Sequence, residues 1–122
     1  MPLIAILDDE KALREIITDE LMNEGYEVVA HEDKDAFLDL LPVLQPDLII
    51  SDINSPRMSG LEFLHAIKSD ERYKHIPVII VSGALDLQTA LHVAKLGASD
   101  CLSKPFDAGE LLEVIQRALM RV

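Results

Sequence analysis

Short runs of apolar residues recur along this chain, and each is followed by a segment with helical periodicity. Residues 3–7, 48–50 and 77–81 are apolar in nearly every position. Such runs are too short for helices, and apolar side chains on both faces indicate strands that are covered on both sides. The segments between them carry apolar residues at spacings of three and four, as amphipathic helices do. A chain of alternating strands and helices can fold in only a few ways.

The pattern predicts five strands, each followed by a helix. Turn residues, glycine and proline separate the segments, and no linker, repeat or low-complexity stretch interrupts them. We therefore expect one domain over residues 1–122. The strands are predicted at 3–7, 26–30, 48–50, 77–81 and 100–102, and the helices at about 12–21, 34–44, 60–68, 86–96 and 107–119.

Several residues mark where the helices begin and end. Asp9 is a candidate cap for the first helix and Gly25 a candidate stop. Pro42 should end or distort the second helix. Asp107 and Glu110 have the spacing of a capping box at the start of the last helix. The predicted buried faces include Ala12, Leu13, Ile16, Ile17 and Leu21 in the first helix, and Leu87, Leu91 and Ala94 in the fourth.

Alternating strands and helices with fully apolar strands predict an α/β fold, a parallel sheet with helices on both faces. Right-handed crossovers leave few topologies. For five strands they favour a doubly wound (βα)5 domain in the flavodoxin-like order 2-1-3-4-5. This order places strands 1 and 3 side by side at the point where the direction of winding changes, which is where ligands bind in such sheets.

Composition excludes several classes of function. The chain has 122 residues, and its formal charge of −11 disfavours direct binding to nucleic acid or anionic membranes. A single cysteine, Cys101, permits no internal disulfide and suits a reducing compartment. No signal peptide is evident, and no apolar stretch approaches the ~18 residues of a membrane span. We therefore expect a cytoplasmic location.

Polar residues follow four of the predicted strands. Asp8 and Asp9 follow the first strand, Asp52 the third, Ser82 the fourth and Lys104 the fifth. Each has an ordinary explanation by itself, as a turn former, a helix cap or a solvated side chain. Because the carboxyl ends of parallel strands meet at one edge of a sheet, their shared placement favours a functional site.

The chemistry of such a site follows from its charges. Carboxylates ~5 Å apart repel by roughly 3 kcal/mol per pair at an effective dielectric near 20, so the cluster holds a proton or binds a cation. Hard oxygen ligands suit Mg²⁺ or Mn²⁺, and Mg²⁺ commonly bridges to phosphate. Lys104 and Ser82 would then contact phosphoryl oxygens. Asp52 is the best-placed nucleophile and would form an acyl phosphate.

Taken together, these motifs resemble the receiver domain of two-component response regulators over essentially the whole chain. The resemblance rests on Ile6-Leu7-Asp8-Asp9-Glu10, Asp52-Ile53-Asn54 with Pro56 and Met58-Ser59-Gly60, Val81-Ser82-Gly83, Gly97-Ala98-Ser99-Asp100 and Lys104-Pro105-Phe106.

The resemblance implies a role for each site residue. Asp52 would take a phosphoryl group from the phosphohistidine of a histidine kinase or of a phosphotransfer protein, and so switch contacts with an output domain or partner. Asp8 and Asp9, Asp52 itself and the main-chain carbonyl of Asn54 would hold Mg²⁺. Ser82 would sense the phosphoryl group and Lys104 would pair with it. The Lys104–Pro105 peptide would be cis. Such a domain is a phosphoprotein of a phosphorelay and has no enzymatic turnover beyond phosphorylation and dephosphorylation of itself.

Three positions depart from the family pattern. Cys101 stands where the family usually has a tyrosine or phenylalanine that turns inward on phosphorylation. Ser55 stands where methionine is common, and Gly83 where alanine is common. The residues for phosphorylation are therefore complete, whereas the readout through the last strand is expected to differ or to be muted.

Two alternatives remain open from the sequence. One is a Mg²⁺-dependent phosphatase or hydrolase of related fold, which would need a second carboxylate two residues beyond the nucleophile. That position is Asn54, and no insertion could form a cap over a substrate. The other is a pseudo-receiver, an interaction module that binds partners without being phosphorylated.

Overall fold

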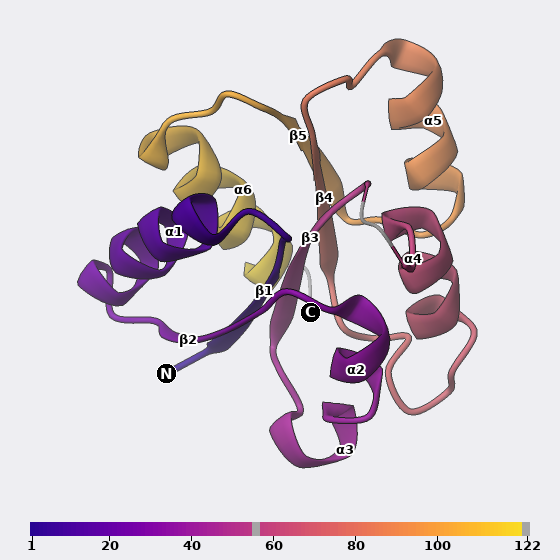
Figure 1. Cartoon of the computed structure of the whole chain (residues 1–122), viewed down its shortest axis with the longest axis horizontal. Helices are drawn as coiled ribbons and strands as arrows, with labels where there is room; N and C mark the ends of the chain where they lie inside the picture. Colours follow the sequence, from indigo (N-terminus) through magenta and orange to yellow (C-terminus); the bar gives the residue numbers. More distant parts are fainter. Residues whose placement is uncertain (55–56, 121–122) are drawn as a thin grey trace.

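Five parallel strands form one sheet, in the order β2-β1-β3-β4-β5, in the computed structural model, which describes residues 1–54 and 57–120. Figure 1 shows the sheet running through the middle of the domain. The order and the parallel pairing confirm the predicted doubly wound, flavodoxin-like α/β fold. The strands are β1 (Leu3–Leu7), β2 (Glu27–His31), β3 (Leu48–Asp52), β4 (Val78–Ser82) and β5 (Asp100–Ser103).

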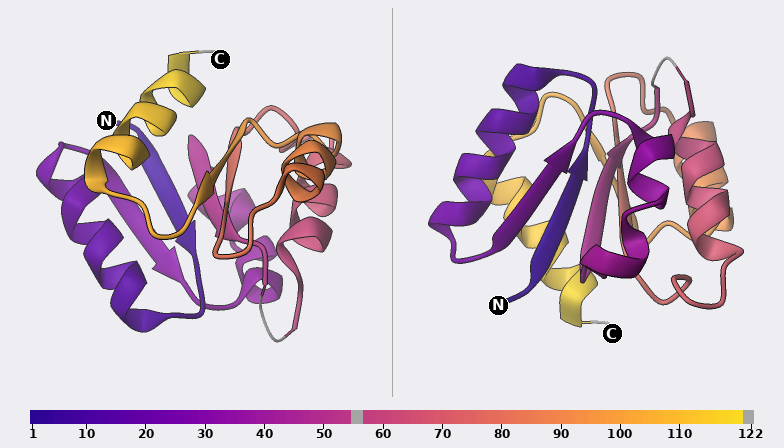
Figure 2. Two further views of the ribbon diagram at one scale, coloured as in Figure 1. Left: turned by 90° about the horizontal axis from the view of Figure 1, so that it is seen from above. Right: turned by 60° about the horizontal axis from the view of Figure 1, so that its bottom comes forward.

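Helices cover both faces of the sheet. In Figures 1 and 2, α1 and α6 lie on one side of the strands, and the other helices lie on the opposite side. Within the described residues, no helix is both long enough and apolar enough to cross a membrane. The helices are α1 (Lys11–Asn23), α2 (Lys34–Leu38), α3 (Leu41–Leu44), α4 (Gly60–Lys68), α5 (Leu87–Lys95) and α6 (Ala108–Met120).

The central strand β3 is buried on both faces. Leu48 and Ile50 pack into the apolar cluster under α1 and α6, whereas Ile49 packs into the cluster under α2, α4 and α5. All three side chains are no more than 1% exposed. Burial of both faces explains the unbroken apolar sequence of this strand, and it leaves the polar end of the strand as its one chemically distinct part.

The predicted helix over 34–44 is wrong as a single element. The chain forms the short helices α2 and α3, and Pro42 lies in the first turn of α3. A helix that continued through this segment would lose the hydrogen bond to the carbonyl of Leu38, and the ring of Pro42 would clash with that carbonyl. The expected distortion by Pro42 is therefore confirmed, and it shortens α2 to little more than one turn.

The predicted cap of α1 is also wrong. Glu10 is the N-cap residue and its side chain makes no capping bond, while Oδ1 of Asp8 accepts a hydrogen bond of 2.9 Å from the backbone N–H of Glu10. Two other helix signals are confirmed. Gly25 has φ of 90° just after α1, and Asp107 accepts a 2.8 Å bond from the N–H of Glu110 at the start of α6.

The buried face predicted for α5 is wrong. Leu87 is 75% exposed and Leu91 is 54% exposed, whereas Val93 is buried. Ala94 is exposed as well. This short helix carries apolar residues on two sides, so their spacing alone does not decide which side packs on the sheet. In α1 two predicted core residues are likewise exposed, Ala12 and Ile16, the latter at 58%, while Ile17 is buried.

The link from β3 to α4 is tightly packed at Gly60. Its backbone N–H donates a 2.7 Å hydrogen bond to the carbonyl of Ile53. A Cβ atom at Gly60 would overlap the carbonyl oxygen of Asp52 and the Cα of Ile53. Ser59 caps the helix in a reciprocal box with Glu62. The start of α4 is therefore held directly against the end of β3.

We expect Gly60→Ala to lower the free energy of unfolding by about 2 kcal/mol or more, because backbone has to move to admit the methyl group. Alanine is otherwise the better helix former, so intrinsic propensity predicts the opposite sign. Chemical denaturation measures the difference.

Gly83→Ala is the matched control. A Cβ atom there meets nothing within 4 Å. We expect its effect on the free energy of unfolding to stay below about 1 kcal/mol. Equal stability of the two variants would contradict the close approach at Gly60.

Candidate functional site

The carboxyl ends of β1, β3, β4 and β5 meet at one edge of the sheet, as the strand order requires. In the ladders Asp52 lies opposite Val81, and Ser82 lies opposite Ser103. A depression of about 250 Å³ opens at this edge. The structure thus brings the predicted site residues to one place. The depression is lined by Asp9, Glu10, Asp52, Ile53, Asn54, Val81, Ser82, Gly83 and Lys104.

Three carboxylates form a cluster in the site. Asp8, Asp9 and Asp52 each bring an oxygen within 4.8 Å of the other two. Asp8 is 2% exposed and Asp52 is 4% exposed, whereas Asp9 is exposed. Hard oxygen donors at this spacing, with two of the three withdrawn from water, fit a small divalent cation such as Mg²⁺.

Lys34 is a site residue that the sequence analysis missed. Its ammonium group forms an ion pair and a hydrogen bond with Oδ1 of Asp52. The side chain of Lys34 is fully buried. Buried lysines are uncommon and are nearly always paired, so this contact is part of the architecture of the site.

The first turn of α2 aims Lys34 into the site. Asp33 caps this helix by accepting from the N–H groups of Asp35 and Ala36, and it also pairs with Arg57 beyond β3 at 3.0 Å. Phe37, one turn after Lys34, packs its ring near that of Phe63 in α4, with centroids 6.4 Å apart.

Residues three apart share one face of a helix, so the packing of Phe37 turns Lys34 inward as well. The sequence did carry a signal for this. A lysine stands where the spacing to Phe37, Leu38 and Leu41 predicts an apolar residue.

Lys104 pairs with a different carboxylate of the cluster. Its ammonium group donates to Oδ2 of Asp8 at 3.1 Å and lies 3.5 Å from Oε1 of Glu10. Its backbone N–H donates to the carbonyl of Ser82 at 2.8 Å, and the Lys104–Pro105 peptide is cis. Burial disfavours the charged ammonium, but the hydrogen bond and charge of Asp8, with Glu10 and Asp52, outweigh it and raise the pKa of Lys104.

Burial also controls the acidity of Asp52. Removal from water raises the pKa of its carboxyl, and the negative charges of Asp8 and Asp9 add to this effect. The hydrogen bond and charge of Lys34 act in the opposite direction but do not cancel it. Lys34 therefore supplies the main stabilisation of the Asp52 carboxylate.

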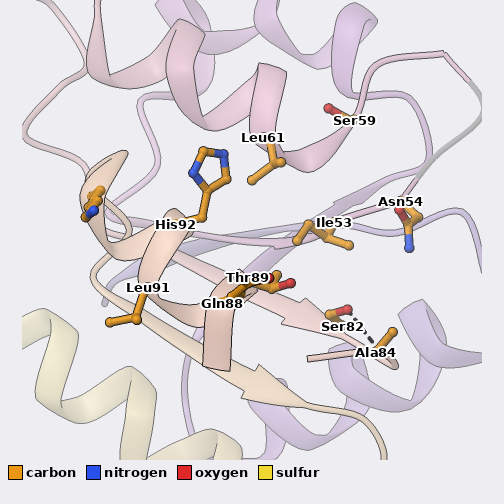
Figure 3. Close-up of a pocket in the computed structure, with 11 residues that line it drawn as sticks. Ile53, Asn54, Ser59, Leu61, Ser82, Ala84, Gln88, Thr89, Leu91 and His92 are labelled. Atoms are coloured by element: carbon orange, nitrogen blue, oxygen red, sulfur yellow. Dashed lines mark hydrogen bonds between the residues drawn. The ribbon is translucent and has the colours of Figure 1, made fainter. Parts of the chain in front are cut away.

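Ser82 lies at the border between the depression and a larger hollow. Its hydroxyl is buried and accepts a 3.1 Å hydrogen bond from the N–H of Ala84. The larger hollow, about 730 Å³, runs from Ser82 and Asn54 between α4 and α5. Figure 3 shows Leu61 and His92, which project from α4 and α5 respectively, among the residues that line it. A change at Ser82 would therefore reach the surface between these helices.

Cys101 lies in β5, opposite Ile80 of β4. It is half-buried against the apolar cluster on the α2, α4 and α5 face, and burial raises the pKa of its thiol. The residue therefore packs as a small side chain against this cluster. Ser55 and Pro56, which the sequence analysis singled out, lie outside the described residues.

Comparisons with known proteins agree on one family. A sequence model described as the response regulator receiver domain matches residues 4–116. The DNA-binding transcriptional regulator NtrC from Proteus hauseri is 39% identical over 93% of this chain, which covers 24% of NtrC. The transcriptional regulatory protein FixJ from Bradyrhizobium diazoefficiens is 34% identical over 95% of this chain, which covers 56% of FixJ. The chain thus spans from about a quarter to just over half of these relatives.

Among solved structures, the chemotaxis protein CheY4 from Vibrio cholerae superposes on this chain with a TM-score of 0.91 at 30% identity. The match covers 97% of this chain and 98% of CheY4. In this case the similarity extends over nearly all of both chains.

The raised pKa of Asp52 predicts a pH dependence of stability. The folded protein keeps this proton to a higher pH than the unfolded chain, in which the pKa is about 3.9. As pH rises through the interval between the two values, the unfolded state binds fewer protons and the free energy of unfolding falls. Asp52→Asn removes the carboxyl group and with it this contribution to the pH dependence of stability.

We therefore expect the stability of Asp52→Asn minus that of the wild type to grow as pH rises through this interval and then to level off. Denaturant unfolding at a series of pH values, without divalent cations, measures the difference. A difference that shrinks with rising pH would contradict the assignment.

Proposed function

This chain belongs to the response regulator receiver domain family, which acts in two-component signalling, and we propose that Asp52 is its phosphoacceptor. On this proposal residues 1–122 form one receiver domain. The observation that carries the proposal is the gathering of Asp8, Asp9 and Asp52 around one point, with Ser82 and Lys104 at the same edge of the sheet.

The proposed reaction is phosphoryl transfer from a phosphohistidine. A carboxylate oxygen of Asp52 attacks the phosphorus atom and forms a new P–O bond. The P–N bond breaks, and its electron pair stays on the imidazole nitrogen, which takes up a proton. The product is an acyl phosphate on Asp52 and a free histidine on the donor.

Lys104 and Ser82 would donate hydrogen bonds to the phosphoryl oxygens. The ammonium of Lys104 is charged and tied to Asp8, within reach of the same depression. A fixed positive charge there stabilises negative charge that builds up on the transferred group. The hydroxyl of Ser82 can turn from the N–H of Ala84 and donate to a phosphoryl oxygen.

Asp8, Asp9 and Asp52, with the main-chain carbonyl of Asn54, would hold Mg²⁺ or Mn²⁺. Bound there, the cation would neutralise phosphoryl charge and relieve the repulsion among the carboxylates. The donor set supports this assignment, since it consists of oxygens within 4.8 Å of one another.

The partners follow from the family. We propose a histidine kinase or phosphotransfer protein as the donor, a cytoplasmic location, and an output domain or protein that reads the phosphorylated state. DNA binding by a longer protein, as the name of NtrC states for that relative, would belong to another domain. The charge of −11 on this chain repels DNA.

The family assignment favours signalling over the hydrolase. A hydrolase would also need an acid or base two residues beyond Asp52, and Asn54 cannot exchange a proton in that role. A pseudo-receiver would keep the fold but leave Asp52 unmodified. Phosphorylation of Asp52 therefore distinguishes a phosphorylated receiver from a pseudo-receiver.

We expect a small phosphodonor such as phosphoramidate to add one phosphoryl group to the chain in the presence of Mg²⁺. A metal chelator should prevent the reaction, because the carboxylates then repel the anionic donor. Intact-mass spectrometry measures the addition, and Asp52→Asn should remain unlabelled.

Asp39→Asn is the matched control, since Asp39 is exposed at the end of α2 and away from the depression. It should be labelled as the wild type is. Label that persists in Asp52→Asn would overturn the assignment of the acceptor, and no label on the wild type under any condition would favour the pseudo-receiver.

The position of Cys101 predicts a limited response to phosphorylation. A beryllofluoride group bound at Asp52 should strongly shift the backbone amide resonances of residues 82–84, because the bond between Ser82 and Ala84 breaks. Amides of β5 should shift little, since no aromatic ring is present at Cys101 to turn inward. Large shifts through β5 and the adjoining surface of α6 would contradict this prediction.

A further inference from the structure

Both buried carboxylates of the site are already paired with a lysine. Lys34 reaches Asp52 from α2, and Lys104 reaches Asp8 from the segment after β5. The two lysines approach the cluster from different elements and bind different carboxylates. The positive charge that the acid cluster needs is therefore partly supplied by the protein itself.

The two lysines differ in their freedom to move. The side chain of Lys104 is 21% exposed and has a second acidic neighbour in Glu10. The side chain of Lys34 is fully buried, and Asp52 is its one ion-pair partner within residues 1–54 and 57–120. Lys104 can therefore leave Asp8 and keep a partner, whereas Lys34 that leaves Asp52 loses its counter-charge inside the protein.

The contact of Lys34 falls on the reactive group itself. Oδ1 of Asp52 accepts its hydrogen bond, and a carboxylate has only two oxygens, one for the phosphoryl group and one for a cation on the proposed function. The ammonium of Lys34 on Oδ1 therefore uses part of the acceptor capacity of Asp52, and its positive charge opposes the approach of a cation.

We propose that Lys34 is an internal competitor for the divalent cation, holding one oxygen of Asp52 in the resting protein until a cation displaces it or shares the carboxylate. This rests on the proposed function for the identity of Asp52 as acceptor. Lys34 is a positioning residue in this account, since it orients Asp52 and sets how readily the acid cluster takes up a cation.

Electrostatics decides the direction of the effect. The formal charge of Asp8, Asp9 and Asp52 with Lys34 and Lys104 is one negative charge. Without Lys34 it is two, and one oxygen of Asp52 becomes free. Both changes strengthen the attraction for a divalent cation.

The test is the affinity of the unphosphorylated, full chain for Mn²⁺, measured by calorimetric titration at fixed ionic strength. We expect Lys34→Met and Lys34→Gln to bind Mn²⁺ about tenfold or more tightly than the wild type. A lysine that served only to stabilise the fold would leave the affinity unchanged or weaken it when removed.

Lys74→Met is the matched control. It removes the same charge from an exposed lysine that pairs with Glu71 in the segment between α4 and β4. We expect less than a twofold change, since screening weakens distant surface charges. An equal gain in all three variants would assign the effect to net charge and overturn the role of Lys34.

If neither Lys34 variant folds, the wild-type protein can be tested by NMR spectroscopy. The ammonium ¹H–¹⁵N resonance of Lys34 should shift when Mg²⁺ is added, because its hydrogen bond to Asp52 is disturbed. A Lys34 resonance that stays in place at saturating Mg²⁺ would overturn the proposal, as would unchanged Mn²⁺ affinity in folded variants.

The proposal and the proposed function can fail separately. Phosphoryl labelling of Asp52 in the wild type, together with unchanged Mn²⁺ affinity in the variants, would keep the function and remove the role of Lys34. Tighter Mn²⁺ binding in the variants, with no labelling of Asp52, would keep the competition and remove the acceptor.

Discussion

Repulsion among three carboxylates at one edge of the sheet is the constraint on which the rest of the site depends. Asp8, Asp9 and Asp52 lie within 4.8 Å of one another, two of them buried, so folding would be costly without nearby positive charge. The protein meets this cost with Lys34 and Lys104, which lie 70 residues apart in the sequence. The fold therefore holds the carboxylates close together beside two ammonium groups, which is the arrangement that the proposed cation binding and phosphoryl transfer require.

The scaffold fixes these charges through backbone contacts as well as side chains. β3 is buried on both faces and cannot shift without exposing apolar surface, and Gly60 packs directly against its end. Lys104 is tied by its own N–H to the carbonyl of Ser82. Residues that are far apart in the sequence are thus held close together with little freedom to move. Fixed charges of this kind are how a preorganised site stabilises charge that develops in a reaction.

The sequence predicted the fold and most of the site for one physical reason. Fully apolar strands ending in polar residues leave a parallel sheet as the solution, and the strand order then places Asp8, Asp52, Ser82 and Lys104 at one edge. Where a helix has apolar residues on two faces, their spacing does not indicate which face packs on the sheet. For this reason the buried face of α5, around Leu91, was predicted wrongly.

Lys34 was missed because pattern analysis assigns a lysine in an amphipathic helix to solvent. The spacing to Phe37, Leu38 and Leu41 did mark its position as one for an apolar residue, and two contacts of the folded chain explain its burial. Pro42 separates α2 from α3, so that α2 is short, and the packing of Phe37 against Phe63 orients this face of α2 toward α4. The ion pair with Asp52 then compensates for burying the charge.

Lys34 and Cys101 bear on two different steps of the proposed function. On that proposal Lys34 would act where the signal enters, because it contacts Asp52, and Cys101 would act where the signal leaves, because it provides no aromatic ring to report the phosphoryl group. If the response in β5 is muted as predicted, a change at Ser82 would reach the surface through the hollow between α4 and α5, which Ser82 borders. A receiver built in this way would transmit its state mainly through those two helices.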